Sequence, residues 1–280
     1  MDFKDGLDKD KDESRELNGL ALVGLPTYSG HKKWTEKFLQ QHRDHDVYLI
    51  DTTLNDDEEH YKWLCSLSHD YSNLIKVEHR DWNPSKTWLS YMLGDCWDRT
   101  IQFAIDNNYK YWVWTASDIF SSCKNGVNNQ IKLIESQKNM HIVGYPTNIY
   151  TMDGPPSVLH SADMLYDDFK GMFVPDFYCW TEILKARNAS PNGIVSLWGS
   201  IGFTTFDRDA FTHSRFLHPT NYQILSGCDL IYLQQIHKAG FEYWCDMNHR
   251  ALNMKEPLSK AEDVVGSYKD MFLKVHEVKG

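Results

Sequence analysis

The feature that most constrains the fold is an alternation of short apolar runs with longer segments of helical periodicity. Residues 20–25 form a continuous apolar run that ends at Pro26, which is typical of a parallel strand buried on both faces. Residues 34–42 then carry apolar side chains at helical spacing, and residues 47–50 form a second apolar run that ends at Asp51. This order predicts a strand, a helix and a second strand.

The alternation continues through the first half of the chain. The patterns predict a helix over about 56–67, an edge strand over 74–77, a long helix over about 86–107 and a strand over 109–114. Helices that connect short strands make right-handed βαβ units, which give a parallel sheet with helices on both faces. We therefore predict an α/β fold with a Rossmann-like, mostly parallel sheet in one merged domain.

The second half of the chain is less regular. A helix over about 128–137 and a strand over 141–144 precede a long irregular stretch, 152–174. Long loops inside a compact domain are usually lids or binding loops, so we expect a lid there. A helix over about 228–238 and a strand over 243–245 follow it.

Charge and composition narrow the classes of partner. The chain of 280 residues has a net charge of −10, which disfavours a protein whose affinity comes mainly from neutralising nucleic-acid phosphates or anionic lipid. A metal ion would still let an acidic enzyme bind phosphates. No stretch approaches the roughly 18 apolar residues of a membrane span, and we expect a cytoplasmic protein with a flexible acidic tail over 1–17. Aromatic residues make up 14%, so some are expected to line a functional surface.

Polar residues follow three of the predicted strands. Thr27 and Tyr28, Asp51, and Asp118 stand at these ends, and open α/β sheets bind ligands at the carboxyl ends of their strands. Neither a GxGxxG nor a GxxxxGK[ST] pattern follows the first strand, so a nucleotide held by a glycine cradle is not expected.

The order of these motifs resembles that of the GT-A glycosyltransferases, in particular family 2. In that group the first strand ends in PTYN, the second in Asp and the fourth in a DxD motif. A glycine-rich strand follows later in the chain. After it, an acidic residue opens a helix that ends in Ala-Gly-aromatic, and a His often follows this helix. This sequence carries Pro26-Thr27-Tyr28-Ser29, Asp51, Ala116-Ser117-Asp118, the segment 199–211, Asp229 with Ala239-Gly240-Phe241, and His249.

The resemblance implies a nucleotide-diphosphate sugar donor, linked to UDP or GDP, and a divalent cation, Mn²⁺ or Mg²⁺. A cation held by carboxylate and imidazole stabilises the leaving diphosphate as a Lewis acid. Asp118 is the metal ligand carried over from the DxD position, and His249 is the second protein ligand that the family pattern implies. Ala116 replaces the first DxD carboxylate, which puts full metal dependence in question.

The remaining donor contacts also come from the resemblance. Asp51 and Tyr28 would contact the base and ribose beside Pro26 and Thr27, Ser117 would hydrogen-bond the ribose or phosphate, and Arg99 would approach the diphosphate. Two of the candidates have a plain structural alternative: Asp118 also suits a helix N-cap, and Arg99 a solvated helix arginine.

The second half would bind the acceptor. Inverting members use a carboxylate at the place of Asp229 as general base, although Cys228 stands where the family often has a second acid. Aromatic rings commonly stack on sugars and bases, and Trp180 and Trp198, the latter just before Gly199, are the candidates for the acceptor.

The sequence thus predicts a nucleotide-sugar-binding half over 18–120 and an acceptor-binding, catalytic half over 121–280. Two alternatives keep the fold: a sugar-phosphate nucleotidyltransferase, and a non-catalytic sugar- or nucleotide-binding module, the latter motivated by Ala116 and Cys228. The acceptor stays open among saccharide, lipid, protein and modified nucleic-acid base.

Overall fold

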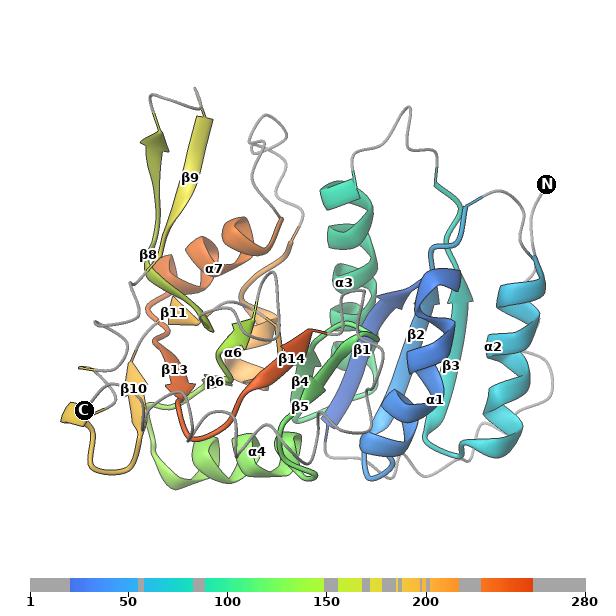
Figure 1. Cartoon of the computed structure of the whole chain (residues 1–280), viewed down its shortest axis with the longest axis horizontal. Helices are drawn as coiled ribbons and strands as arrows, with labels where there is room; N and C mark the ends of the chain where they lie inside the picture. Colours follow the sequence, from blue (N-terminus) through green and yellow to red (C-terminus); the bar gives the residue numbers. More distant parts are fainter. Residues whose placement is uncertain are drawn as a thin grey trace, which may run out of the picture.

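Eight strands form the central sheet of the computed structural model, in the order β10-β13-β6-β12-β4-β1-β2-β3 (Figure 1). β1 pairs in parallel with β2 and β4, β2 with β3, and β6 with β13, whereas β12 and β10 run antiparallel to their neighbours. The prediction of a mostly parallel sheet with β3 at an edge is confirmed. The strands are β1 Ala21–Thr27, β2 Asp46–Asp51, β3 Leu74–His79, β4 Tyr111–Trp114, β6 Ile142–Gly144, β10 Ile194–Ser196, β12 Thr204–Asp207 and β13 Tyr243–Asp246.

The structure describes residues 21–54, 58–82, 89–148, 156–167, 172–177, 185, 188–196, 198–199, 202–216 and 228–253. Within these ranges β12 of the second half lies between β4 and β6, so both halves of the chain share one sheet. A single merged domain, as predicted, follows from this strand order.

Helices cover both faces of the central sheet, as the alternating pattern predicts. α1, α2 and α4 share one hydrophobic cluster with Ala21, Val23 and Leu25 of β1, and α3, α6 and α7 share the cluster on the other face with Leu22. Successive side chains of a strand point to opposite faces, so one apolar run serves both layers. The helices are η1 Ser29–His31, α1 Lys32–Gln41, α2 Glu58–Asp70, α3 Leu89–Asp106, α4 Gly126–Ser136, α6 Arg208–Thr212 and α7 Cys228–Lys238.

Aromatic side chains fill the layer between the sheet and α3, α6 and α7. Phe216 stacks on Tyr232 with ring centroids 4.1 Å apart, and Trp112 lies against both rings. Among the described residues, Tyr28 and Tyr91 are the exposed large hydrophobic side chains. Most of the described rings form the core, and the expectation that some aromatic residues line a functional surface stays a prediction.

A second, smaller sheet joins the central one. It contains β5 Ile119–Ser121, β7 Thr147–Asn148, β8 Pro156–Asp167, β11 Trp198–Gly199 and β14 Ala251–Asn253, and β9 Met172–Phe177 pairs with β8. The stretch 152–174, expected to be irregular, is instead mainly strand, because β8 and β9 pair antiparallel. Figure 1 shows these two strands projecting beyond the body of the molecule.

The strand directions bring several chain segments to one edge of the central sheet. β12 lies between β4 and β6 and is antiparallel to both, so β4 and β6 run in the same direction. β1, β2, β3, β4, β6 and β13 therefore all end at this edge. α7 leads through Gly240 into the start of β13. None of the helices in the described ranges has the length and apolar character to cross a membrane.

Candidate functional site

Side chains from three segments meet at the carboxyl ends of β1 and β4. The Thr27 and Ser117 hydroxyl oxygens lie 2.9 Å apart, and His31 Nδ1 lies 2.8 Å from Ser117 Oγ. His31 Nε2 is 3.4 Å from Asp118 Oδ2. We call Thr27, His31, Ser117 and Asp118 the strand-end cluster. The structure confirms that the ends of these two strands come together.

His31 is the member that sequence reasoning missed. It ends η1, the short helix directly after β1, and its ring lies 4.2 Å from that of Tyr28, which is 46% exposed. Burial lowers the pKa of His31 below its ordinary value, although Asp118 opposes this. The imidazole is therefore neutral at pH 7. Its place four residues after Thr27 in the sequence was the available clue.

The hydrogen bonds of His31 point its second nitrogen at a carboxylate. In the tautomer that carries the proton on Nδ1, the ring donates to Ser117 and presents the Nε2 lone pair to Asp118. Two electron-pair donors that face each other at 3.4 Å suit a cation between them. A second hydrogen bond that fixes the orientation of the ring is also what a metal-binding histidine needs.

Asp51 lies at the end of β2 but is fully buried. His60 Nδ1 lies 2.9 Å from Asp51 Oδ1, His79 Nδ1 lies 3.0 Å from Oδ2, and Thr53 Oγ1 donates to Oδ1 at 2.6 Å. Burial works against the charged carboxylate, but the hydrogen bonds from His60, His79 and Thr53 outweigh it and hold the pKa of Asp51 well below its usual range.

His79 is the partly exposed member of this second group. Its hydrogen bonds to Asp51 and to Asp81, the latter at 2.9 Å, raise its pKa above the ordinary value. A ligand at the end of β2 therefore meets His79, Thr53 and the backbone before it meets the Asp51 carboxylate. Direct contact of Asp51 with a base would require these side chains to move.

Arg99 lies on α3, away from the strand-end cluster. Its guanidinium donates to Glu78 Oε1 at 2.7 Å and to Asp95 Oδ2 at 3.0 Å. These two carboxylates hold it beside β3 at the edge of the sheet, an arrangement that matches the alternative reading of a surface helix arginine.

Asp229 occupies the first turn of α7 and is half-buried. Tyr232 and Leu233 of the same helix are buried against the sheet, which fixes the helix in place.

His249 pairs with Asp246 in this structure. β5 and β14 pair antiparallel with Ser121 opposite Ala251, so Asp118 precedes one end of this ladder while His249 lies at the other. His249 lies 2.8 Å from Asp246. That Asp118 and His249 share one metal ion stays a prediction.

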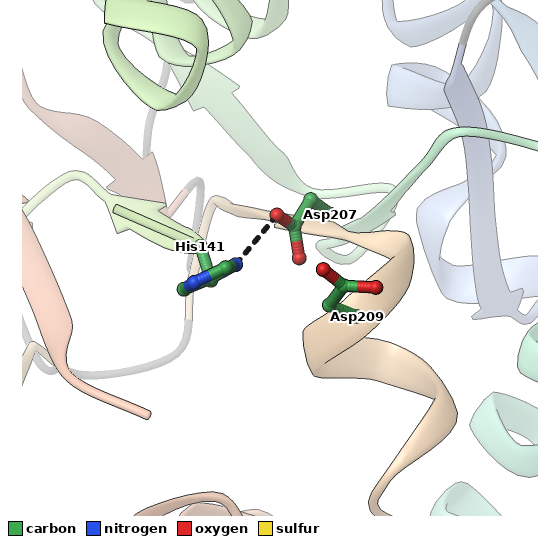
Figure 2. A group of neighbouring side chains, drawn as sticks. All are labelled: His141, Asp207 and Asp209. Carbon is green, nitrogen blue, oxygen red and sulfur yellow. Dashed lines mark hydrogen bonds and ion pairs between the residues drawn. The ribbon is translucent and has the colours of Figure 1, made fainter. Parts of the chain in front are cut away.

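A different histidine and two carboxylates lie close enough to hold a cation. The ligand atoms of His141, Asp207 and Asp209 all lie within 4.8 Å of one another, and His141 Nδ1 is 2.8 Å from Asp207 Oδ2 (Figure 2). His141 precedes β6 and Asp207 ends the antiparallel β12, so this group lies at the amino edge of the sheet, opposite the strand-end cluster. Asp207 also caps α6 by accepting from Ala210 N.

The other predicted residues contribute less to the described site. Pro26 is buried within β1, opposite Ile50 of β2. Trp198 and Gly199 form β11, which pairs with β8, and the side chain of Trp198 lies outside what the structure describes. Trp180 also lies outside the described residues.

Comparisons with known proteins show the fold. No family model matches the sequence, and the search of curated proteins finds no match. The structure is similar to that of GalNAc-T7, solved with UDP, GalNAc and Mn²⁺, with a TM-score of 0.54 and 11% identity over 86% of this chain and 44% of that chain. It is also similar to the mannosyltransferase PcManGT from Pyrobaculum calidifontis, solved with GDP-Man and Mn²⁺, with a TM-score of 0.51 and 11% identity over 92% and 64%.

The chain thus spans less than two thirds of the length of either neighbour. Both neighbours are glycosyltransferases, and the shared architecture confirms the predicted α/β fold of the GT-A type. At this identity the likeness establishes the fold alone.

Proposed function

We propose that this protein is a glycosyltransferase that moves a sugar from a UDP- or GDP-linked donor to an acceptor hydroxyl. The observation that supports this most is the strand-end cluster: a hydroxyl pair, an imidazole and a carboxylate converge at the carboxyl ends of β1 and β4, where an open α/β sheet binds its ligand. The two structural neighbours were solved with UDP or GDP-Man and with Mn²⁺, which supports the same class of donor.

Asp118 and His31 are the residues that would hold a divalent cation. An oxygen and a neutral imidazole nitrogen 3.4 Å apart fit neighbouring positions around Mn²⁺ or Mg²⁺, which accept such donors. The cation would supply charge to stabilise the leaving nucleoside diphosphate. His31 takes the role that the family pattern gives to a later histidine, and it compensates in part for Ala116.

The nucleotide would lie along the ends of β1 and β2. The exposed ring of Tyr28 offers a stacking face for a base or ribose, and Thr27 and Ser117 offer hydroxyl groups to the ribose or phosphate. Asp51 would act through His79, which it orients by a hydrogen bond to Nδ1 and whose pKa it raises. Arg99 has no part in this proposal.

Asp229 is proposed as the general base. It would remove the proton of the acceptor hydroxyl while that oxygen attacks the anomeric carbon from the face opposite the diphosphate, which inverts the configuration. Its place in the first turn of α7, a helix that Tyr232 and Leu233 anchor against the sheet, supports this role. The aromatic residues Trp180 and Trp198, with Gly199, remain proposed acceptor contacts, and the segment 152–174, largely β8 and β9, remains the proposed lid.

A ligand-binding panel tests the donor class. Ligands that bind only the folded state raise its stability, so a UDP- or GDP-sugar with Mn²⁺ should raise the Tm of the protein by several degrees. Asp118→Asn should remove the Mn²⁺-dependent part of this shift. Asp209→Asn, a matched change in the group at the opposite edge, should leave it unchanged. A shift that is equal in chelator and in Mn²⁺ would contradict the metal site, and the absence of a shift with any nucleotide sugar would contradict the donor class.

A further inference from the structure

A small hollow lies between the end of α1 and the start of α4. It measures about 240 Å³, including its mouth, which is open to solvent. His42 and His45 line it from the turn after α1, Lys124 and Asn128 line it from the start of α4, and Phe203 lines it as well. None of the residues of the strand-end cluster belongs to this lining, so the hollow is a separate place on the molecule.

Two buried histidines on this lining have ring nitrogens without a partner. His42 is 1% exposed and His45 is 7% exposed, so more than nine tenths of each residue is buried. Neither nitrogen of His42, nor Nδ1 of His45, has a hydrogen-bond partner in the described part of the chain. Burial lowers the pKa of both rings, so both are neutral at pH 7 and each carries one N–H that can donate. Because a buried donor without a partner costs free energy, we expect a bound group to accept from these rings.

The start of α4 supplies further donors. The first N–H groups of a helix have no partner inside it, and they form the positive end of the helix dipole. α4 has 11 residues, Asn125 at its N-cap makes no side-chain hydrogen bond to it, and no acidic side chain occupies its first turn. The positive end of α4 is therefore neither capped by Asn125 nor neutralised by a carboxylate of its own turn. Helix N-termini of this kind bind phosphate and sulfate.

Gly126 allows the helix start and the histidine rings to lie close together. A Cβ atom at this position would lie 2.4 Å from Ser121 Oγ and 3.1 Å from the ring of Phe203. Phe203 in turn stacks on His42, with ring centroids 5.7 Å apart. The first residue of α4 and the His42 imidazole thus pack on the same aromatic ring, which brings the helix start and the ring nitrogens to one hollow.

The charged groups beside the hollow favour an anion. Lys124, which belongs to the lining, is exposed and carries a positive charge. Asp44 also belongs to the lining, but its carboxylate lies 3.7 Å from Arg43 Nε, so a neighbouring cation offsets its charge. Hydrogen-bond donors on the lining together with these cations suit a compact oxyanion better than a metal ion.

We propose that this hollow binds a small tetrahedral oxyanion, either inorganic phosphate or the phosphate group of a small compound. Its oxygens accept hydrogen bonds from the first N–H groups of α4 and from the rings of His42 and His45, and Lys124 balances its charge. Phe203 is fully buried and offers no face on which a base could stack, so the phosphate group itself is what the hollow recognises. The site is independent of the proposed transferase reaction, since it uses none of the residues assigned to donor, metal or acceptor.

An NMR titration of the backbone amides of the whole chain tests the proposal. Inorganic phosphate, sulfate and glycerol phosphate are added in turn at pH 7 and constant ionic strength, without divalent metal. We expect the amide signals of Gly126, Val127 and Asn128 to shift and saturate with phosphate and with sulfate, whereas sodium chloride should give no saturable shift. Glycerol phosphate that binds at least as tightly as inorganic phosphate identifies a phosphorylated small compound as the ligand, and weaker binding identifies the free ion.

Substitutions with matched controls locate the site. Asn128→Asp places a carboxylate in the first turn of α4, which the helix dipole tolerates, and it should weaken phosphate binding at least about tenfold. Lys124→Ala should weaken it about threefold. Asn139→Asp and Lys132→Ala make the same changes at exposed positions outside the hollow and should leave the affinity unchanged.

The unmodified protein decides alone if a variant fails to fold. The proposal is overturned if the amide signals of Gly126, Val127 and Asn128 do not shift, or if they shift without saturation. It is equally overturned if folded Asn128→Asp binds phosphate as tightly as the unmodified protein, or if Asn139→Asp weakens binding as much as Asn128→Asp does.

Discussion

The buried ring of His42 makes a sharp prediction about stability at low pH. His42 follows α1 and is 1% exposed, and its imidazole lies 4.4 Å from the ring of Phe38 and 5.7 Å from that of Phe203. Neither ring nitrogen has a hydrogen-bond partner within the described structure. Burial therefore lowers the pKa of His42 from 6.5 to about 3, with a smaller effect from His45.

The sign and size of the effect follow from this shift. The unfolded chain binds a proton at His42 near pH 6.5 and the folded chain does not, so stability falls as the pH drops from about 6.5 toward 3. At pH 5, which is about 1.5 units below the unfolded value, the loss is about 2 kcal/mol at about 1.4 kcal/mol per unit. Because the pKa of His42 in the folded protein lies far below 5, the loss at pH 5 depends almost wholly on the pKa of His42 in the unfolded chain.

His42→Phe isolates this contribution. It keeps an aromatic ring between Phe38 and Phe203 and removes the titrating group together with two buried nitrogens. Urea unfolding of both proteins at pH 7 and pH 5 gives four free energies of unfolding, and the advantage of the variant should grow by about 2 kcal/mol between the two pH values. Other titrating groups contribute equally to both proteins and cancel. If the difference between the two proteins is the same at both pH values, the neutral, buried state of His42 is refuted.

Three further substitutions test the fold and the site. Gly24→Ala would place a Cβ atom 2.3 Å from Thr100 Cβ on α3, so it should lower the free energy of unfolding by about 1–3 kcal/mol in denaturant titration. Asp51→Asn should cost about 3 kcal/mol at pH 7, with a penalty that shrinks as the pH falls through the lowered carboxyl pKa, and it should lower the pKa of His79 measured by NMR toward 6.5; a His79 pKa that does not move would exclude the pairing. Asp229→Asn should reduce sugar transfer by about 10² to 10⁴ with unchanged donor binding, and near-normal transfer would exclude it as the base.

The main elements of the fold could be predicted because their causes are local. The periodicity of apolar residues gave α7 at Cys228–Lys238 and placed β1, β2 and β4 within one or two residues of their observed bounds. The prediction of an irregular stretch over 152–174 was wrong because the cause of its structure is not local. Gly154-Pro155-Pro156 indicates a turn, but β8 and β9 are strands because they pair with each other, and such pairing between distant residues leaves little mark on the local sequence.

The candidate site was predictable only in part. Parallel strands end at one edge, so the meeting of Thr27 with Ser117 and Asp118 followed from the order of the elements. The position of His249 could not be predicted in this way, because the order of motifs does not tell which end of the β5–β14 ladder a residue occupies. His31 was missed for a related reason: its role depends on a ring orientation set by Ser117, which is 86 residues away.

Turnover of a nucleotide sugar tests the central proposal most directly. We predict that a UDP- or GDP-linked sugar releases nucleoside diphosphate in the presence of Mn²⁺, and that chelation of the metal stops the release. Asp118→Asn should abolish it, because this carboxylate lies 3.4 Å from His31 at the proposed cation site, whereas Asp209→Asn at the opposite edge should not. Tight binding of the nucleotide without any release, across the full panel of sugars and with Mn²⁺ present, would contradict a transferase and indicate a binding module of the same fold.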